Sequence, residues 1–388
     1  MEDAFALAEL TTPVLAARHT SLLAAEQRVG PAGELPDPEL IVGIDNLPTD
    51  GADAGSLTAD FMTMRKVGLM QRFVHRDKRT LRQDRAAADV DREAAMLISE
   101  RLSVRVAVAR AWIDTHLAER RHALLLALRP RFDLGVAAAE AQLIRGGGGA
   151  DALAAKDARI ALEDRISEAE LATRIARAEL ARWLLDDAQR PLQSPPDWRD
   201  LGNASAASLL PRIDQHRELL GYAAQTRAAE VDVQLARADK RPDWSLELAY
   251  ADRGPAYSNM LSLMVRVDLP VFASRRQDPM IAAKLAERDR VDAEREDARR
   301  RHAAELQSVV ATWQTALVQI DRFDHELRPL ALDRTDAALA AYRAGRGDLS
   351  AAIAALTAET DRELDYVDRL ATLAAAWAEL RYSFAEEH

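Results

Sequence analysis

Residues 260–269 read MLSLMVRVDL and residues 244–250 read WSLELAY, and both stretches alternate in polarity. Every second residue of the first is a large aliphatic side chain: Leu261, Leu263, Val265, Val267 and Leu269. A period of two is the pattern of a β-strand with one apolar and one polar face. Strands of about 9–11 residues with this alternation are typical of transmembrane barrels. We therefore predict strands at about 243–251 and 260–270. The candidates for a barrel lumen are Glu247, Ser262, Arg266 and Asp268.

A second pair of strands is predicted earlier in the chain, at about 38–45 and 61–71. Its alternation is weaker, because Ile41 and Gly43 leave one face of the first strand without polar groups. An ordinary half-buried hairpin packed on helices would also explain alternation alone. The placement of both pairs beside very long helices favours the membrane interpretation, since such helices provide no compact core to cover a hairpin.

The two halves of the chain repeat one plan. Three landmarks recur at a spacing of 199 residues: Phe73 and Phe272, the Leu-Arg-Pro triplets at 128–130 and 327–329, and the glycines Gly146 and Gly345. A constant spacing over three landmarks indicates a duplication. We predict a first repeat over 1–203, with a helical hairpin at about 75–185 and a connector at 186–203. The second repeat covers 204–388, with its helical hairpin at about 279–385.

The helices are predicted from composition and length. Glycine and proline are scarce, at 16 and 15 of 388 residues, whereas 48% of the chain is hydrophobic with only 5% aromatic. Alanine and leucine favour helix, whereas turns need glycine and proline. One uninterrupted helix over 74–145 would be about 108 Å long. Pro130 and Pro329 are expected to kink the two long helices at the same height, because proline lacks the backbone N–H.

Charge and composition exclude several classes of protein. With 52 basic and 63 acidic residues the net charge is −11, which disfavours nucleic-acid binding. The absence of cysteine removes disulfides, thiolate metal sites and cysteine nucleophiles. No stretch reads as a spanning helix, and the opening MEDAFALAEL lacks the features of a secretory signal. We expect this chain to be a mature or trimmed form.

No catalytic, cofactor or metal site is predicted. The glycines at 146–149 lack the Gly-Lys-Ser/Thr of a phosphate loop, so we interpret them as a turn. The tightest polar group is Asp321, Asp324, His325 and Glu326. Asp321 and His325 are spaced to share one helix face, but a metal site needs at least three convergent ligands. We favour a solvated helix face there, and we do not expect an enzyme.

Four strands in one chain cannot close a barrel, and open strand edges are not tolerated in lipid. The sequence therefore predicts that several chains close one barrel together. Three chains would provide twelve strands, which lies in the known range.

A duplicated chain with two strand pairs and two long helical hairpins resembles the TolC-like outer-membrane factor family over essentially its whole length. The strings LPDPEL at 35–40, GIDNLP at 43–48, DFMTMR at 60–65 and GLMQ at 68–71 resemble its CzcC-type heavy-metal-efflux branch. The fold class this implies is mainly helical with a small β part. Three protomers would form a twelve-stranded outer-membrane β-barrel continued by an α-helical barrel across the periplasm.

The resemblance also implies partners and a gate. The homotrimer would be the exit duct of a tripartite pump, joined through a periplasmic adaptor to an inner-membrane resistance-nodulation-division transporter that exports heavy-metal cations. The expected tip, gate and adaptor-contact residues are Gly146, Gly147, Gly148, Gly149, Tyr342, Gly345, Arg346, Gly347 and Asp348. Where relatives carry carboxylates at the entrance, this chain has Ala351 and Ala354, so an acidic ring would use Asp348 or Asp361.

The sequence thus predicts a passive outer-membrane duct with contacts to outer-membrane lipid and none to nucleic acid. A soluble or periplasmic coiled-coil scaffold or adaptor is the alternative. The acidic excess fits either a cation-selective tunnel or a merely soluble surface.

Overall fold

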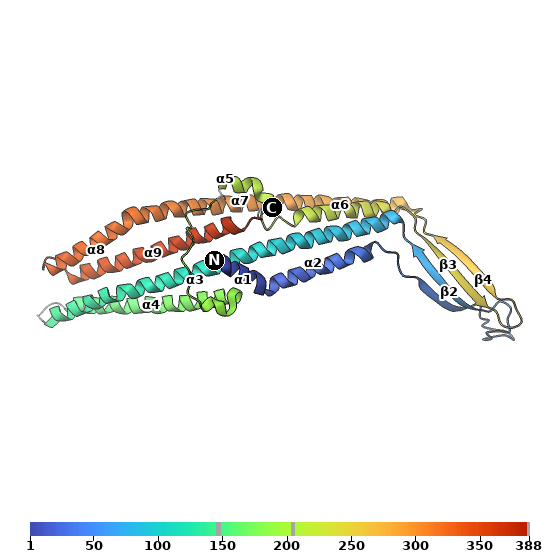
Figure 1. Cartoon of the computed structure of the whole chain (residues 1–388), viewed down its shortest axis with the longest axis horizontal. Coiled ribbons are helices and arrows are strands. Elements are labelled where there is room, and N and C mark those ends of the chain that lie inside the picture. The colour runs from blue at the N-terminus through green and yellow to red at the C-terminus, as the bar shows by residue number, and fades with distance from the viewer. Residues whose placement is uncertain (145–148, 203–205, 386–388) are drawn as a thin grey trace. The chain divides into compact units, whose positions relative to one another are not determined.

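The computed structural model describes residues 1–144, 149–202 and 206–385 (Figure 1). The chain divides into two compact units. The first unit comprises Met1–Ala17, Ile98–Leu220 and Ala298–His388, and the second comprises Arg18–Leu97 and Gly221–Asp297. Each unit therefore takes segments from both halves of the sequence.

The described residues are mostly helical, and their elements follow the predicted duplicated order of helix, two strands and long helical hairpin. The helices and strands are α1 (Glu2–Thr11), α2 (Pro13–Ala32), β1 (Glu39–Asp45), β2 (Met64–Phe73), α3 (Arg76–Ile144), α4 (Gly149–Leu184), α5 (Ala206–Leu209), α6 (Tyr222–Ala238), β3 (Trp244–Asp252), β4 (Met260–Val267), α7 (Gln277–Arg322), α8 (Arg328–Arg343) and α9 (Leu349–Tyr382). Short 3₁₀ helices occupy Leu185–Gln189, Leu210–Gln215 and Ala273–Arg275, and a π-helical turn occupies Phe323–Leu327. No helix in the described part of the chain combines the length and the apolar character needed to cross a bilayer.

The strands form one antiparallel sheet in the order β1-β2-β3-β4 (Figure 1). The central pairing joins β2 from the first half of the sequence to β3 from the second. The register places Leu40 opposite Leu69, Leu69 opposite Leu248, and Leu248 opposite Leu263. One row of four leucines therefore crosses the sheet on a single face.

The leucine row belongs to a continuous apolar face, because side chains two residues apart along a strand share a face. Its members are all exposed: Leu40, Val42, Ile44, Val67, Leu69, Trp244, Leu248, Tyr250, Leu261, Leu263, Val265 and Val267. Leu261 and Leu263 are 72% and 68% exposed. We call this set the apolar face. It confirms the alternation predicted for β4 and extends it across the sheet.

On the opposite face of the sheet, the close approach of β2 and β3 leaves no room for a side chain at Gly68. A Cβ added at Gly68 would lie 2.9 Å from the Cβ of Ala249 and 3.0 Å from the carbonyl oxygen of Leu248. Gly43, on the same face of β1, has no atom within 4 Å of such a Cβ. Glycine is therefore required at Gly68 for close approach of two strands, but not at Gly43.

Gly68→Ala is expected to destabilise the protein by about 1–3 kcal/mol, the usual cost of overpacking a well-filled site. Gly43→Ala is the matched control and is expected to be neutral or stabilising, since glycine is disfavoured inside strands. Thermal melting of the two purified variants measures the difference. Equal melting temperatures for the two variants would contradict the close approach.

The helical hairpins of the first unit pack through small and branched side chains. α4 runs back along α3, and α9 runs back along α8 (Figure 1). One buried cluster joins α3, α4 and α9: Leu125, Leu128, Phe132, Leu162, Ile166, Ala169 and Leu356. The two prolines do not act alike. α3 continues past Pro130, whereas the second long helix is interrupted by the π-helical turn immediately before Arg328 and Pro329.

Candidate functional site

The polar face of the sheet carries the residues predicted for a lumen. Glu247 and Ser262 lie on the face opposite the apolar face, as does Arg266. Asp268 follows β4 with the same alternation, and its backbone N–H donates to the Asp243 carbonyl at 2.9 Å. The structure therefore brings all four predicted residues to one face. Their role in a lumen stays a prediction.

Two cations on this face were missed by sequence reasoning. Lys66 Nζ donates to Glu247 Oε1 at 2.5 Å, and Arg266 lies 3.9 Å from the second carboxylate oxygen of Glu247. Arg72 lies 3.4 Å from Asp268. Lys66 and Arg72 both come from β2, where the sequence alternation is weak. The register of β2 against β3 places Lys66 and Arg72 on the polar face. This face therefore carries both positive and negative side chains, which water can solvate.

The second helical tip is built by a glycine turn. Gly345 has a φ of +68°, a left-handed conformation that favours glycine. The Gly345 N–H donates to the Tyr342 carbonyl at 3.0 Å, and the Arg346 N–H donates to the Ala341 carbonyl at 2.9 Å. These two bonds define a Schellman motif that ends α8. Asp348 is the N-cap residue of α9, so the predicted residues from Tyr342 to Asp348 form one compact turn.

Tyr342 also ties the two hairpins of the first unit together. Its hydroxyl donates to Gln142 Oε1 of α3 at 3.2 Å. Its ring packs against a buried cluster from α3, α4 and α9: Ala139, Ala152, Ala155 and Leu349. Sequence reasoning identified Tyr342 but not Gln142, which no motif marks. Gly146, Gly147 and Gly148 lie outside the described residues, and Gly149 is the first residue of α4.

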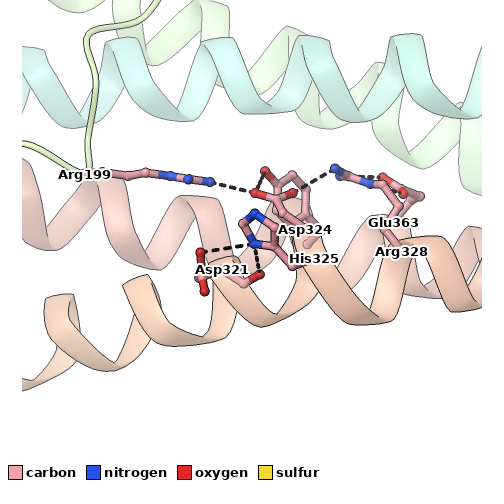
Figure 2. Close-up of polar contacts among 7 residues, drawn as sticks. Arg199, Asp321, Asp324, His325, Arg328 and Glu363 are labelled. Carbon is pink, nitrogen blue, oxygen red and sulfur yellow. Dashed lines mark hydrogen bonds and ion pairs between the residues drawn. The ribbon is translucent and has the colours of Figure 1, made fainter.

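The polar group at 321–326 does not converge on one point (Figure 2). His325 Nδ1 lies 3.2 Å from Asp321 Oδ1, and both side chains are exposed. Asp324 is engaged by Arg199 Nη2 at 2.7 Å and by Arg328 Nη1 at 2.8 Å (Figure 2). Within the described residues, no group of three or more histidine or acidic side chains is arranged to hold a metal ion.

The π-helical turn instead centres on a network of ion pairs. Arg328 donates to both carboxylate oxygens of Glu363 on α9, at 2.7 and 3.2 Å (Figure 2). Its guanidinium lies 4.4 Å from the centroid of the Tyr366 ring, which itself stacks on Phe323 at 4.6 Å. Arg199 extends the network to the connector between the two halves of the chain. We call these contacts the Arg328 network.

The first half contains the simpler counterpart of this network. Arg129 stands where Arg328 stands in the repeated Leu-Arg-Pro triplet, and it donates to Glu163 of α4 at 2.7 Å. The position equivalent to Asp324 is Leu125, which is 1% exposed. Both repeats therefore contain an arginine–glutamate ion pair between the helices of the helical hairpin. The π-helical turn and the contact of Arg199 with Asp324 are observed in the second repeat. Mid-helix π turns are frequent at functional sites.

A histidine lies in a cavity elsewhere in the first unit. His216 pairs through its backbone with Phe384 and lines a cavity of about 310 Å³. Burial, followed by the charges of the nearby His302 ring and Arg217, lowers the pKa of His216 from 6.5 to about 4. Glu379 and Glu305 act in the opposite sense but do not reverse the shift.

Folding stability is therefore expected to fall as the pH falls from 6.5 to about 4. In this window the unfolded chain binds a proton at His216 that the folded chain excludes, so the slope is at most about 1.4 kcal/mol per pH unit. Melting temperatures from pH 7.5 to 4 should show a flatter profile for His216→Gln than for wild type. His19→Gln, at an exposed position of α2, is the control. Parallel profiles for all three proteins would contradict the assignment.

At the level of sequence, no protein-family model and no curated protein matches the chain. Solved structures do share its fold. A membrane protein from Pseudomonas aeruginosa matches with a TM-score of 0.84 at 16% identity, over 98% of this chain and 89% of that one. The outer membrane protein VceC from Vibrio cholerae gives 0.78 at 15% identity, over 99% and 96% of the two chains. CusC, solved in connection with its folding and transmembrane channel formation, gives 0.76 at 14%, over 99% and 92%. The duplicated protomer of this chain therefore has the fold of these membrane proteins.

Proposed function

We propose that the chain is an outer-membrane exit duct of a tripartite efflux pump, with its sheet in the lipid. The observation that carries this proposal is the apolar face, where large apolar side chains from all four strands stay exposed. Exposed apolar patches of this extent are rare on soluble proteins and mark interaction with a membrane or a partner. The charged polar face behind it suits a water-filled interior.

Aromatic side chains at both ends of the sheet support a lipid environment. Phe73 and Trp244 stack at 4.1 Å at the end where the helices begin. Tyr250 lies at the other end, near exposed Phe61 and Tyr257 of the connections between strands. Aromatic residues are enriched at the two interfaces of a bilayer.

The open edges of the sheet support assembly into a trimer. Among the described residues, β1 pairs with β2 alone and β4 with β3 alone. Backbone groups at these edges need partners in lipid, because water cannot solvate them there. We infer that β4 of one protomer pairs with β1 of the next, so that three protomers close a twelve-stranded barrel continued by an α-helical barrel.

The duct is passive, and its gate lies at the helical tips. The Tyr342–Gln142 hydrogen bond and the glycine turn at Gly345 support this place for the gate, because both fix the hairpin ends. A periplasmic adaptor and a resistance-nodulation-division transporter are the proposed partners. A heavy-metal cation as cargo rests on the resemblance of residues 35–71 to the CzcC-type branch.

Cell fractionation followed by sizing of the detergent extract tests the duct. We expect the protein in the outer-membrane fraction and at the mass of a trimer. Recovery as a detergent-free soluble monomer would favour the coiled-coil scaffold instead. For the cargo, a deletion strain should lose tolerance to at least one of zinc, cobalt, cadmium, nickel, copper and silver. Unchanged tolerance to all six would remove the metal assignment and leave the duct intact.

A further inference from the structure

A cavity of about 700 Å³ lies in the second unit, where the strands end and the helices begin. The described residues that line it include five cations, namely Arg72, Lys78, Arg82, Arg241 and Arg276. Three carboxylates also line it: Asp239, Asp243 and Asp268. The lining is therefore net positive, although the whole chain carries a net charge of −11.

Ion pairs within the cavity leave part of this positive charge available. Lys78 Nζ lies 3.2 Å from Asp243, and both side chains are buried. Arg241 pairs with Asp77 beside the cavity. Arg82 of α3 and Arg276, just before α7, are exposed and have no ion-pair partner among the described residues. These two guanidinium groups are free to bind an anion from outside.

The cavity lies at the end of the strands and reaches both faces of the sheet: Arg72 and Asp268 line it from the polar face, and it also has an apolar edge. Val267, at the end of β4, belongs to the apolar face and lines the cavity. Leu269 and Met280 line it as well, and they are 68% and 56% exposed. The molecular surface therefore changes from aliphatic to cationic over a few residues. A ligand that fits both parts must be an amphiphile with an anionic head.

We propose that this cavity binds the headgroup phosphate of an anionic glycerophospholipid of the membrane, such as phosphatidylglycerol. The proposal rests on the proposed function, because the apolar face must lie in hydrocarbon for the cavity to lie at headgroup level. Arg82 and Arg276 bind the phosphate oxygens, since the planar guanidinium matches phosphate geometry. The acyl chains continue along Val267 and Leu269 onto the apolar face.

Thermal melting of the delipidated, detergent-purified trimer with added lipid tests the site. Phosphatidylglycerol is expected to raise the melting temperature of wild type by several degrees in a saturable manner. Phosphatidylcholine and inorganic phosphate are expected to leave it unchanged. The double variant Arg82→Gln/Arg276→Gln should need at least about fivefold more phosphatidylglycerol for the same shift. An effect reproduced by inorganic phosphate alone would overturn the lipid assignment.

The matched control is Arg322→Gln/Arg334→Gln, which removes two exposed arginines of the first unit. It should respond to phosphatidylglycerol as wild type does. Equal responses to phosphatidylglycerol from both double variants would overturn the lipid site while leaving the proposed duct intact. Recovery of wild type as a soluble protein without detergent would instead refute the duct.

Native mass spectrometry of wild type gives a second readout. At least one anionic phospholipid per protomer should survive purification, and protomers without bound lipid would count against the site.

Discussion

A Leu263→Arg substitution is expected to prevent assembly of the proposed outer-membrane trimer, whereas Ser262→Arg, one residue away, is expected to permit it. Leu263 is 68% exposed at the centre of β4 and belongs to the apolar face. An arginine on the lipid face of an outer-membrane barrel costs about 2–4 kcal/mol at the bilayer midplane. In the proposed trimer this cost is incurred three times, about 6–12 kcal/mol in total, which is comparable with the whole folding stability of an ordinary protein.

The two variants differ only in the face to which the new charge is attached. Ser262 lies on the polar face, opposite Ala249 and in the row of Gly68, so an arginine there would enter the proposed water-filled interior. The readout is the amount of trimer in detergent extracts of the outer membrane. Equal yields for the two variants would show that the apolar face does not contact lipid. A soluble scaffold would tolerate Leu263→Arg, because an exposed leucine contributes little to a protein in water.

Arg328→Met is expected to destabilise the first unit by about 2–4 kcal/mol. The substitution removes the arginine that donates to both carboxylate oxygens of Glu363. Asp324 keeps Arg199 as its cationic partner, and both carboxylates are partly buried. The substitution also removes a cation–π contact with Tyr366. Removing one member of a partly buried, hydrogen-bonded ion pair is costly because the other charge stays partly desolvated without its partner.

Arg129→Met in the first repeat is the matched control, and its expected cost is below about 1 kcal/mol. Arg129 occupies the equivalent position, but it contacts Glu163 in a more exposed pair, and Arg159 also pairs with that carboxylate. Exposed ion pairs contribute little to stability. Thermal melting of both variants measures the difference. Similar losses for the two would mean that the π-helical turn and its network add no stability beyond the duplicated ion pair.

Much of the fold was predictable because its signals are local. Alternation in β4 assigned Leu261 and Leu263 to one face and Arg266 to the other, as the structure confirms. The spacing of 199 residues predicted the duplicated plan, which the observed elements follow. The turn at Gly345 was also predictable from a local signal, because glycine readily adopts the left-handed conformation that ends a helix at a tight turn.

The remaining features depend on contacts between distant segments. Lys66 and Arg72 could not be assigned to the polar face from β2 alone, because pairing with β3 sets their register. Gln142 contacts Tyr342 across 200 residues of sequence. The two Leu-Arg-Pro triplets are identical, and so their different surroundings could not be read from the triplets themselves.

The sequence by itself determined the helical or strand period of the long elements, the duplication, and the apolar and polar faces of β3 and β4. These properties follow from residue spacing and side-chain chemistry along one segment. Only the tertiary structure decided that β2 joins β3, that Gly68 must be a glycine, and that Arg328 lies between Asp324 and Glu363. Each of these depends on which segments meet in space, and that is set by the summed packing of the whole chain and not by any local pattern.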